Sequence, residues 1–166
     1  MKFITMVDTM REKTRRVYVD TTVVYGAPAK KFSDASRQFW SAVRNGEIVI
    51  IVSDVLADEI ERAPQSVQKL YQAIPESQVE RVESTDESDA LAEQYVAAGV
   101  VGKTHLDDCR HIALATLTQA DALVSWNFGD IVYRRAGYND VNETLGYPRI
   151  KIQSPKQLLE AHHDKT

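Results

Sequence analysis

Five consecutive apolar and β-branched residues, Ile48–Val52, are the feature that most constrains the fold of this chain. A strand with one face in water alternates apolar and polar residues, whereas a strand covered on both faces is apolar throughout. The run therefore predicts a strand inside a parallel sheet, with helices packed on either side. It is the longest strongly apolar run of the sequence, and it is too short to cross a membrane.

Other short strands and helices alternate with this strand along the chain. Further strands are predicted at residues 17–21, 78–82, 122–126 and 149–153. Helices are predicted at residues 33–47, 54–63, 65–74, 84–99, 103–117, 127–137 and 154–161. This alternation predicts a three-layer α/β/α sandwich with a mostly parallel central sheet. We expect a single domain over residues 17–160, preceded by a polar lead-in (1–16) and followed by a polar tail (161–166).

Composition narrows the class of protein and of partner. A length of 166 residues suits one domain, and 43% hydrophobic with 27% charged residues is typical of a globular protein. The net charge of −4 gives no general attraction to nucleic acid, so such a partner would need a local basic patch or a bound cation. The single cysteine, Cys109, suits a reducing compartment, and the first sixteen residues lack the apolar core of a signal peptide. We therefore expect a cytoplasmic protein.

Acidic and amide side chains lie where the predicted strands end. Asp20 ends the first strand, Glu59 lies in the helix after Ile48–Val52, and Asn127 follows the strand at 122–126. In open parallel sheets, ligands bind beyond the carboxyl ends of the strands. Carboxylates held together repel one another unless a proton or a cation neutralises them, and Mg²⁺ or Mn²⁺ suits an all-oxygen set. Such a cation stabilises charge and activates water at a phosphodiester.

Two adjacent acids, Asp107 and Asp108, open the helix "LDDCRHIALATL". Acids in a first turn interact well with the helix dipole, and Thr104 with Asp107 has the spacing of a capping box. Helix capping therefore accounts well for one of the two acids, and the helix dipole accounts adequately for the presence of both. Asp107 also stands four residues before His111, which predicts a contact between them on the helix surface. Glu59 has a similar alternative, as one charge of a solvated helix face.

Four segments in order resemble a known family. The segments "VYVDTTVV", "IVSDVLADEIER", "LDDCRHIALAT" and "LVSWNF" span Val17 to Phe128. Together they resemble PIN-domain proteins, close to the VapC-type toxin ribonucleases of toxin–antitoxin systems. The resemblance implies a PIN-like α/β/α fold and a Mg²⁺- or Mn²⁺-dependent ribonuclease.

The family's site residues transfer onto particular positions. The resemblance implies that Asp20, Glu59 and Asp108 bind the metal, that Asp107 caps its helix, and that Ser125 supports the site at the end of the last core strand. The family usually places a further Asp where this chain has Asn127, so the resemblance makes Asn127 the fourth catalytic position. Asp130 is the alternative fourth acid, one turn further if residues 127–137 are helical.

Two classes of function follow from these residues. The first is a metal-dependent endoribonuclease acting on RNA, the toxin of a pair with an antitoxin protein and, by resemblance, a homodimer. The second is a catalytically weakened PIN-fold module that binds RNA or a protein, which Asn127 favours. A phosphatase is a distant third, because Asp20 lacks the usual Asp-x-Asp pattern. Phe39 and Trp40 are adjacent and are predicted not to face one core together, which makes their helix a candidate dimer surface. The alternative is that Trp40 packs inside the domain.

Overall fold

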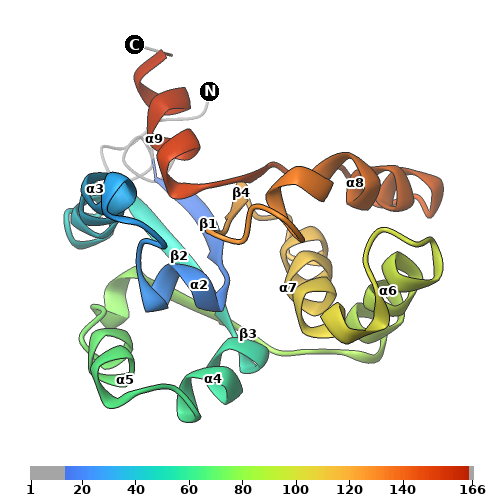
Figure 1. Cartoon of the computed structure of the whole chain (residues 1–166), viewed down its shortest axis with the longest axis horizontal. Helices are drawn as coiled ribbons and strands as arrows, with labels where there is room; N and C mark the ends of the chain where they lie inside the picture. Colours follow the sequence, from blue (N-terminus) through green and yellow to red (C-terminus); the bar gives the residue numbers. More distant parts are fainter. Residues whose placement is uncertain (1–13, 165–166) are drawn as a thin grey trace, which may run out of the picture.

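A five-stranded, all-parallel sheet forms the centre of the molecule in a computed structural model, which describes residues 14–164 (Figure 1). The strand order is β3-β2-β1-β4-β5. The strands are β1 (Arg15–Val19), β2 (Ile48–Ser53), β3 (Val79–Val82), β4 (Ala122–Val124) and β5 (Ile152–Gln153). The predicted polar extensions, 1–16 and 161–166, lie partly outside the described residues.

The apolar run lies inside the sheet, as predicted. Strand β2 pairs in parallel with β1 on one side and with β3 on the other. Its neighbour β1 is the central strand and also pairs with β4. Successive β1 side chains enter opposite layers: Val17 and Val19 pack into one core, and Tyr18 packs into the other. Both faces of the sheet are therefore buried, which explains the lack of alternation in β2.

Helices cover the two faces in two groups, which confirms the sandwich (Figure 1). One core takes side chains from α2 (Thr21–Tyr25), α3 (Ser33–Arg44), α4 (Asp54–Glu61), α5 (Gln65–Gln72) and α9 (Pro155–Asp164). The other takes side chains from α6 (Asp86–Ala97), α7 (Leu106–Leu117) and α8 (Arg135–Thr144). Short 3₁₀ turns are η1 (Lys30–Phe32), η2 (Glu76–Gln78), η3 (Lys103–His105) and η4 (Val132–Arg134). No helix among residues 14–164 is long and apolar enough to span a bilayer.

Several element boundaries differ from the prediction. The first strand ends before Asp20, because this residue accepts a hydrogen bond from Val23 N–H and caps α2. The predicted strand at 149–153 is regular only at Ile152–Gln153. Residues 127–137 are not one helix: a turn follows β4, then η4, and only then α8. These boundaries depend on local hydrogen bonds at the ends of the strands. Such bonds do not affect the spacing of hydrophobic residues, so the hydrophobic pattern of the sequence could not locate the boundaries.

The prediction that Phe39 and Trp40 cannot share a core is wrong. Phe39 is fully buried and Trp40 is only 9% exposed. Their rings meet edge to face, with centroids 5.3 Å apart, and α9 packs against α3. A helix enclosed by both a sheet and a second helix buries more than one stripe. The exposed dimer surface inferred from this pair is therefore absent.

Truncating Trp40 tests this correction. Trp40→Ala should lower the free energy of unfolding by about 3–5 kcal/mol, because a large buried ring leaves a cavity. Urea denaturation followed by circular dichroism measures the change. Tyr133→Ala is the control, since Tyr133 is 72% exposed, and its effect should stay within about 0.5 kcal/mol. A Trp40→Ala protein of native stability would contradict the buried position.

Candidate metal and catalytic site

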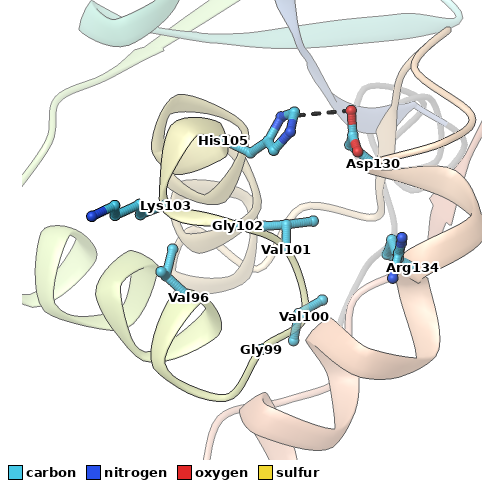
Figure 2. Close-up of a pocket in the computed structure, with 9 residues that line it drawn as sticks. All are labelled: Val96, Gly99, Val100, Val101, Gly102, Lys103, His105, Asp130 and Arg134. Carbon is cyan, nitrogen blue, oxygen red and sulfur yellow. Dashed lines mark ion pairs between the residues drawn. The ribbon is translucent and has the colours of Figure 1, made fainter.

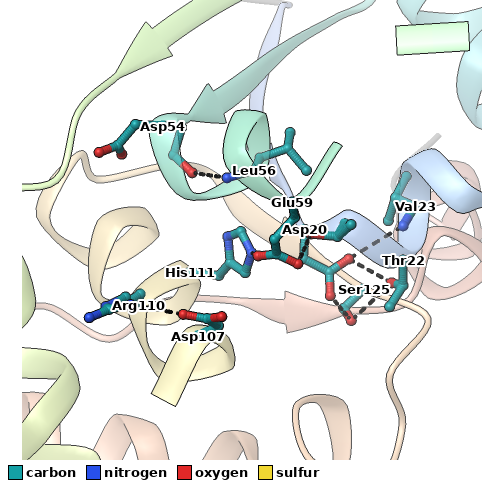
Figure 3. A network of polar contacts seen from close by, with 12 residues as sticks. Asp20, Thr22, Val23, Asp54, Leu56, Glu59, Asp107, Arg110, His111 and Ser125 are labelled. Carbon is teal, nitrogen blue, oxygen red and sulfur yellow. Dashed lines mark hydrogen bonds and ion pairs between the residues drawn. The ribbon is translucent and has the colours of Figure 1, made fainter. Parts of the chain in front are cut away.

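The site lies at the carboxyl edge of the sheet, where two paired strands end side by side. Asp20 directly follows β1, and Ser125 directly follows β4. Ser125 Oγ donates a hydrogen bond to Asp20 Oδ2 at 2.5 Å, and Thr22 Oγ1 donates to Asp20 Oδ1 at 2.6 Å (Figure 3). Two segments of the chain thus fix one carboxylate, since the same Thr22 oxygen also accepts from Trp126 N–H, the residue after Ser125.

Asp20 is only 2% exposed. Burial raises the pKa of its carboxyl group, while the charge of His111 and the hydrogen bonds from Ser125 and Thr22 act in the opposite direction. The neighbours therefore orient the carboxylate, but their hydrogen bonds offset only part of the cost of removing its charge from water. A cation beside Asp20 would supply the missing compensation.

A chain of buried and partly buried hydrogen bonds connects Glu59 to the centre of the sheet. Glu59 Oε1 lies 2.9 Å from His111 Nε2, and Glu59 Oε2 accepts from Thr21 Oγ1 at 2.5 Å. On the other side of the imidazole, His111 Nδ1 lies 2.7 Å from the Tyr18 hydroxyl, which donates to Ser53 Oγ. The helix residue His111 therefore links β1, β2 and α4.

The acids around His111 favour a charged ring. The Glu59 carboxylate is an acceptor and lies against Nε2, so this nitrogen donates to it. On the other side, Nδ1 and the Tyr18 hydroxyl share a hydrogen bond. Burial lowers the pKa of His111, but Glu59, Asp20 and Asp108 outweigh it and the net direction is upward. Burial also raises the pKa of Glu59, and its contacts with His111 and Thr21 reverse that shift to a net lowering.

A second group of ligand atoms lies beside Asp108. In the described part of the chain, His105, Asp108 and Asp130 are the group of three whose candidate ligand atoms all lie within 4.8 Å of one another. His105 Nδ1 is 3.4 Å from Asp108 Oδ2 and 3.5 Å from Asp130 Oδ2. Burial raises the pKa of Asp108, and the negative charge of Asp20 raises it further. Asp108 thus interacts electrostatically with both the Asp20 region and the His105–Asp130 pair.

Asp107 points elsewhere. It is exposed and accepts a hydrogen bond from Arg110 Nη1 at 2.9 Å (Figure 3). No side-chain hydrogen bond caps α7, whose N-cap is His105, so the capping box with Thr104 is not formed. The expected surface contact with His111 is wrong too, because His111 is buried and its ring nitrogens contact Tyr18 and Glu59. The adjacent acids therefore have different surroundings, as their angular separation on a helix requires.

Asn127 organises the turn that carries Asp130. Its N–H donates to Ser125 Oγ, and its Oδ1 accepts from Asp130 N–H at 3.1 Å. The amide oxygen therefore already has a donor. The turn places Asp130 beside Asp108. The sequence-based prediction expected a helix to bring Asp130 to the site, but the segment is not helical.

The acids of four segments are thus gathered at one edge, but unevenly. Asp20, Glu59 and Asp108 all interact with His111, yet they do not form a cluster as tight as the His105–Asp108–Asp130 group. A set of carboxylates with one imidazole fits Mn²⁺ or Mg²⁺ in donor chemistry. His105 was missed from the sequence, and its position three residues before Asp108 was the available signal.

The comparisons with known proteins agree with this architecture. A family model described as "PIN domain" matches residues 16–129. VapC20 of Mycobacterium tuberculosis, a toxin that cleaves the sarcin–ricin loop, has a similar structure, with a TM-score of 0.52 and 12% identity, and the match covers 81% of this chain and 98% of that one. VapBC2 of Rickettsia felis, solved bound to a DNA fragment from its promoter, matches with a TM-score of 0.51 and 12% identity, over 84% of this chain and 98% of that one. No curated protein matches.

The ion pair predicts a titration that can be measured. The pKa of His111 is raised from 6.5, so its charge contributes stability that is complete below about 6.5 and is lost as pH rises through the folded pKa. The NMR titration midpoint of His111 in metal-free protein should lie above 6.5, and Glu59→Gln should lower it. Glu61→Gln, an exposed acid of the same helix, is the control. A native midpoint below 6.5 would show that the ring is neutral.

Proposed function

We propose that this chain, which belongs to the PIN-domain family, is a metal-dependent endoribonuclease and the toxin of a toxin–antitoxin pair. The observation that carries the proposal is the convergence of acids from four segments at the carboxyl edge of the sheet. Asp20 and Asp108 have raised pKa values there because of burial and, for Asp108, the neighbouring charge of Asp20. Acids with pKa values shifted in this way cluster at functional sites, and a divalent cation beside them would stabilise their charged form.

The proposed ligands are Asp20, Glu59 and Asp108, with Asp130 as the fourth acid. Mg²⁺ or Mn²⁺ bound there supplies charge stabilisation and an activated water at a phosphodiester. The chain's own residues prepare the set: Ser125 and Thr22 orient Asp20, and His111 holds Glu59. Ligands held in place by hydrogen bonds reorganise less when substrate binds.

The proposed partners are an RNA substrate and an antitoxin protein. The first is supported by the likeness in fold to VapC20, a toxin that cleaves the sarcin–ricin loop, and the second by the likeness to VapBC2. A homodimer stays part of the proposal on the family resemblance. Its interface must lie away from Phe39 and Trp40, which are buried in the core.

One observation favours the second candidate, a catalytically weakened binding module. Asn127 offers no charge, and its amide oxygen is engaged by Asp130 N–H. If Asp130 does not complete the ligand set, the edge holds one acid fewer than an active enzyme needs. The two candidates differ in whether RNA is cleaved or only bound.

A cleavage assay separates these candidates. The native chain should cleave RNA in Mn²⁺ or Mg²⁺ and lose that activity in EDTA, and Asp20→Asn and Asp108→Asn should abolish it. Asp107→Asn is the matched control, because it removes the same charge from the adjacent, exposed position. Circular dichroism checks that each variant is folded. Cleavage that persists in EDTA, or in both Asp20→Asn and Asp108→Asn, would refute the proposed site.

The fourth acid is tested by a pair of opposite substitutions. Asp130→Asn should raise the metal concentration for half-maximal cleavage by about tenfold, because one carboxylate ligand is lost. Asn127→Asp should lower that concentration, since it adds a charge and keeps the oxygen that accepts from Asp130 N–H. Metal titrations of the initial cleavage rate measure both effects. An Asp130→Asn protein with native metal dependence would contradict the assignment.

A further inference from the structure

A pocket of about 600 Å³ opens directly beside His105, Asp108 and Asp130, the three residues here called the candidate metal group. His105 and Asp130, two members of that group, form part of its wall (Figure 2). The rest of the wall comes from the end of α6, the loop that joins it to η3, Lys103 of η3, and η4. Its volume lies in the range of sites for small organic groups, about 300–1,000 Å³. A ligand in this pocket would touch any group held at the metal site.

Apolar residues form part of the pocket wall: Val96, Val100 and Val101, and Gly99 and Gly102, which have no side chain. Val100 and Val101 are themselves largely buried, with 9% and 8% of their surface exposed. A Cβ atom added at either glycine would meet nothing within 4 Å. The flat face of a nucleobase suits such a surface, because it can pack there without leaving polar groups unpaired.

Arg134 brings a positive charge to the same pocket. Its Nε donates to Gly129 O at 3.3 Å, which holds the side chain beside the turn that carries Asp130. None of the described carboxylates forms an ion pair with Arg134, in contrast to Arg110 and Arg149. A guanidinium without an acidic partner, next to a site for phosphodiester cleavage, is suited to contact a phosphate.

We propose that this pocket binds an unpaired nucleotide next to the bond that is cleaved, with Arg134 contacting its phosphate. The inference rests on the proposed function, because it takes RNA as the substrate. Its basis is the combination of an apolar wall, an unpaired arginine and a shared boundary with the metal group. The net charge of the chain is −4, so affinity for RNA has to come from local contacts of this kind.

The shape of the pocket selects unpaired over paired RNA. In an A-form duplex the bases are stacked, and the deep major groove excludes side chains. A base can enter the pocket only when it is turned out of a stack, as in a single strand, a bulge or a loop. The pocket thus makes a single-stranded or looped segment the preferred substrate.

The test compares two adjacent arginines. Arg135 is also exposed, but it lies outside this pocket. Binding of a fluorescein-labelled single-stranded RNA of about ten nucleotides is measured by anisotropy in EDTA, so that no cleavage occurs. Arg134→Ala should weaken binding about tenfold and reduce the dependence of log K on log salt by about one ion. Arg135→Ala removes the same charge and should change the affinity less than about twofold.

A second variant fills the pocket instead of removing its charge. The backbone at Gly102 has φ −73° and ψ 161°, which any residue adopts, so Gly102→Leu should fold normally and weaken RNA binding to a similar extent. A duplex of the same sequence should bind the native chain at least about tenfold more weakly than the single strand. Thermal unfolding checks the fold of each variant.

The outcomes separate the two proposals. Equal losses for Arg134→Ala and Arg135→Ala, or native affinity in folded Gly102→Leu, would overturn the pocket while leaving ribonuclease activity intact. A native chain that neither binds nor cleaves RNA would overturn the proposed function together with the pocket. A tenfold loss confined to Arg134→Ala and Gly102→Leu would support the pocket whether or not the chain cleaves RNA.

Discussion

The buried ring of His111 is the contact on which the carboxyl edge of the sheet depends. It joins the hydroxyl of Tyr18 on the central strand to the carboxylate of Glu59 on α4, while its own helix carries Asp108. A neutral residue there would leave the negative charges of this edge without an internal counter-charge. Because His111 is only 2% exposed, the charged form of its ring is stable only while those acids surround it. The acids and the histidine therefore stabilise one another.

The sequence predicted the parts of the fold that hydrophobic patterning determines. Ile48–Val52 reads as a doubly covered strand because both faces of β2 are in fact buried. The same reasoning failed at Phe39 and Trp40, since the pattern cannot show that α9 packs against α3 and encloses a second face. It also failed over residues 127–137, where the hydrogen bond from Asp130 N–H to Asn127 holds a turn. This contact produces no periodic pattern of hydrophobic residues in the sequence.

The candidate site was predictable only as far as strand ends and motif order allow. Those two signals gathered Asp20, Glu59 and Asp108 at one edge. They did not indicate that His111 is buried against Glu59. A single histidine in a helix carries no pattern that identifies its partner in another segment. Nor did they point to His105, whose proximity to Asp130 arises from two segments folding toward each other. The positions of His105 and His111 depend on contacts between distant segments. Such contacts cannot be read from the pattern of a single sequence.

Asp20 has a second role that affects how this site can change over evolutionary time. Its side chain caps α2 and receives the hydroxyls of Ser125 and Thr22, so the local fold needs an oxygen acceptor at that position whether or not the chain is catalytic. A descendant that abandons catalysis would still retain an acceptor there, with asparagine or serine as the natural replacements. Asp108, whose side chain caps no helix, is under no such constraint. The persistence of an acid at position 20 is thus a weak sign of activity, and the residue at position 108 is the better one.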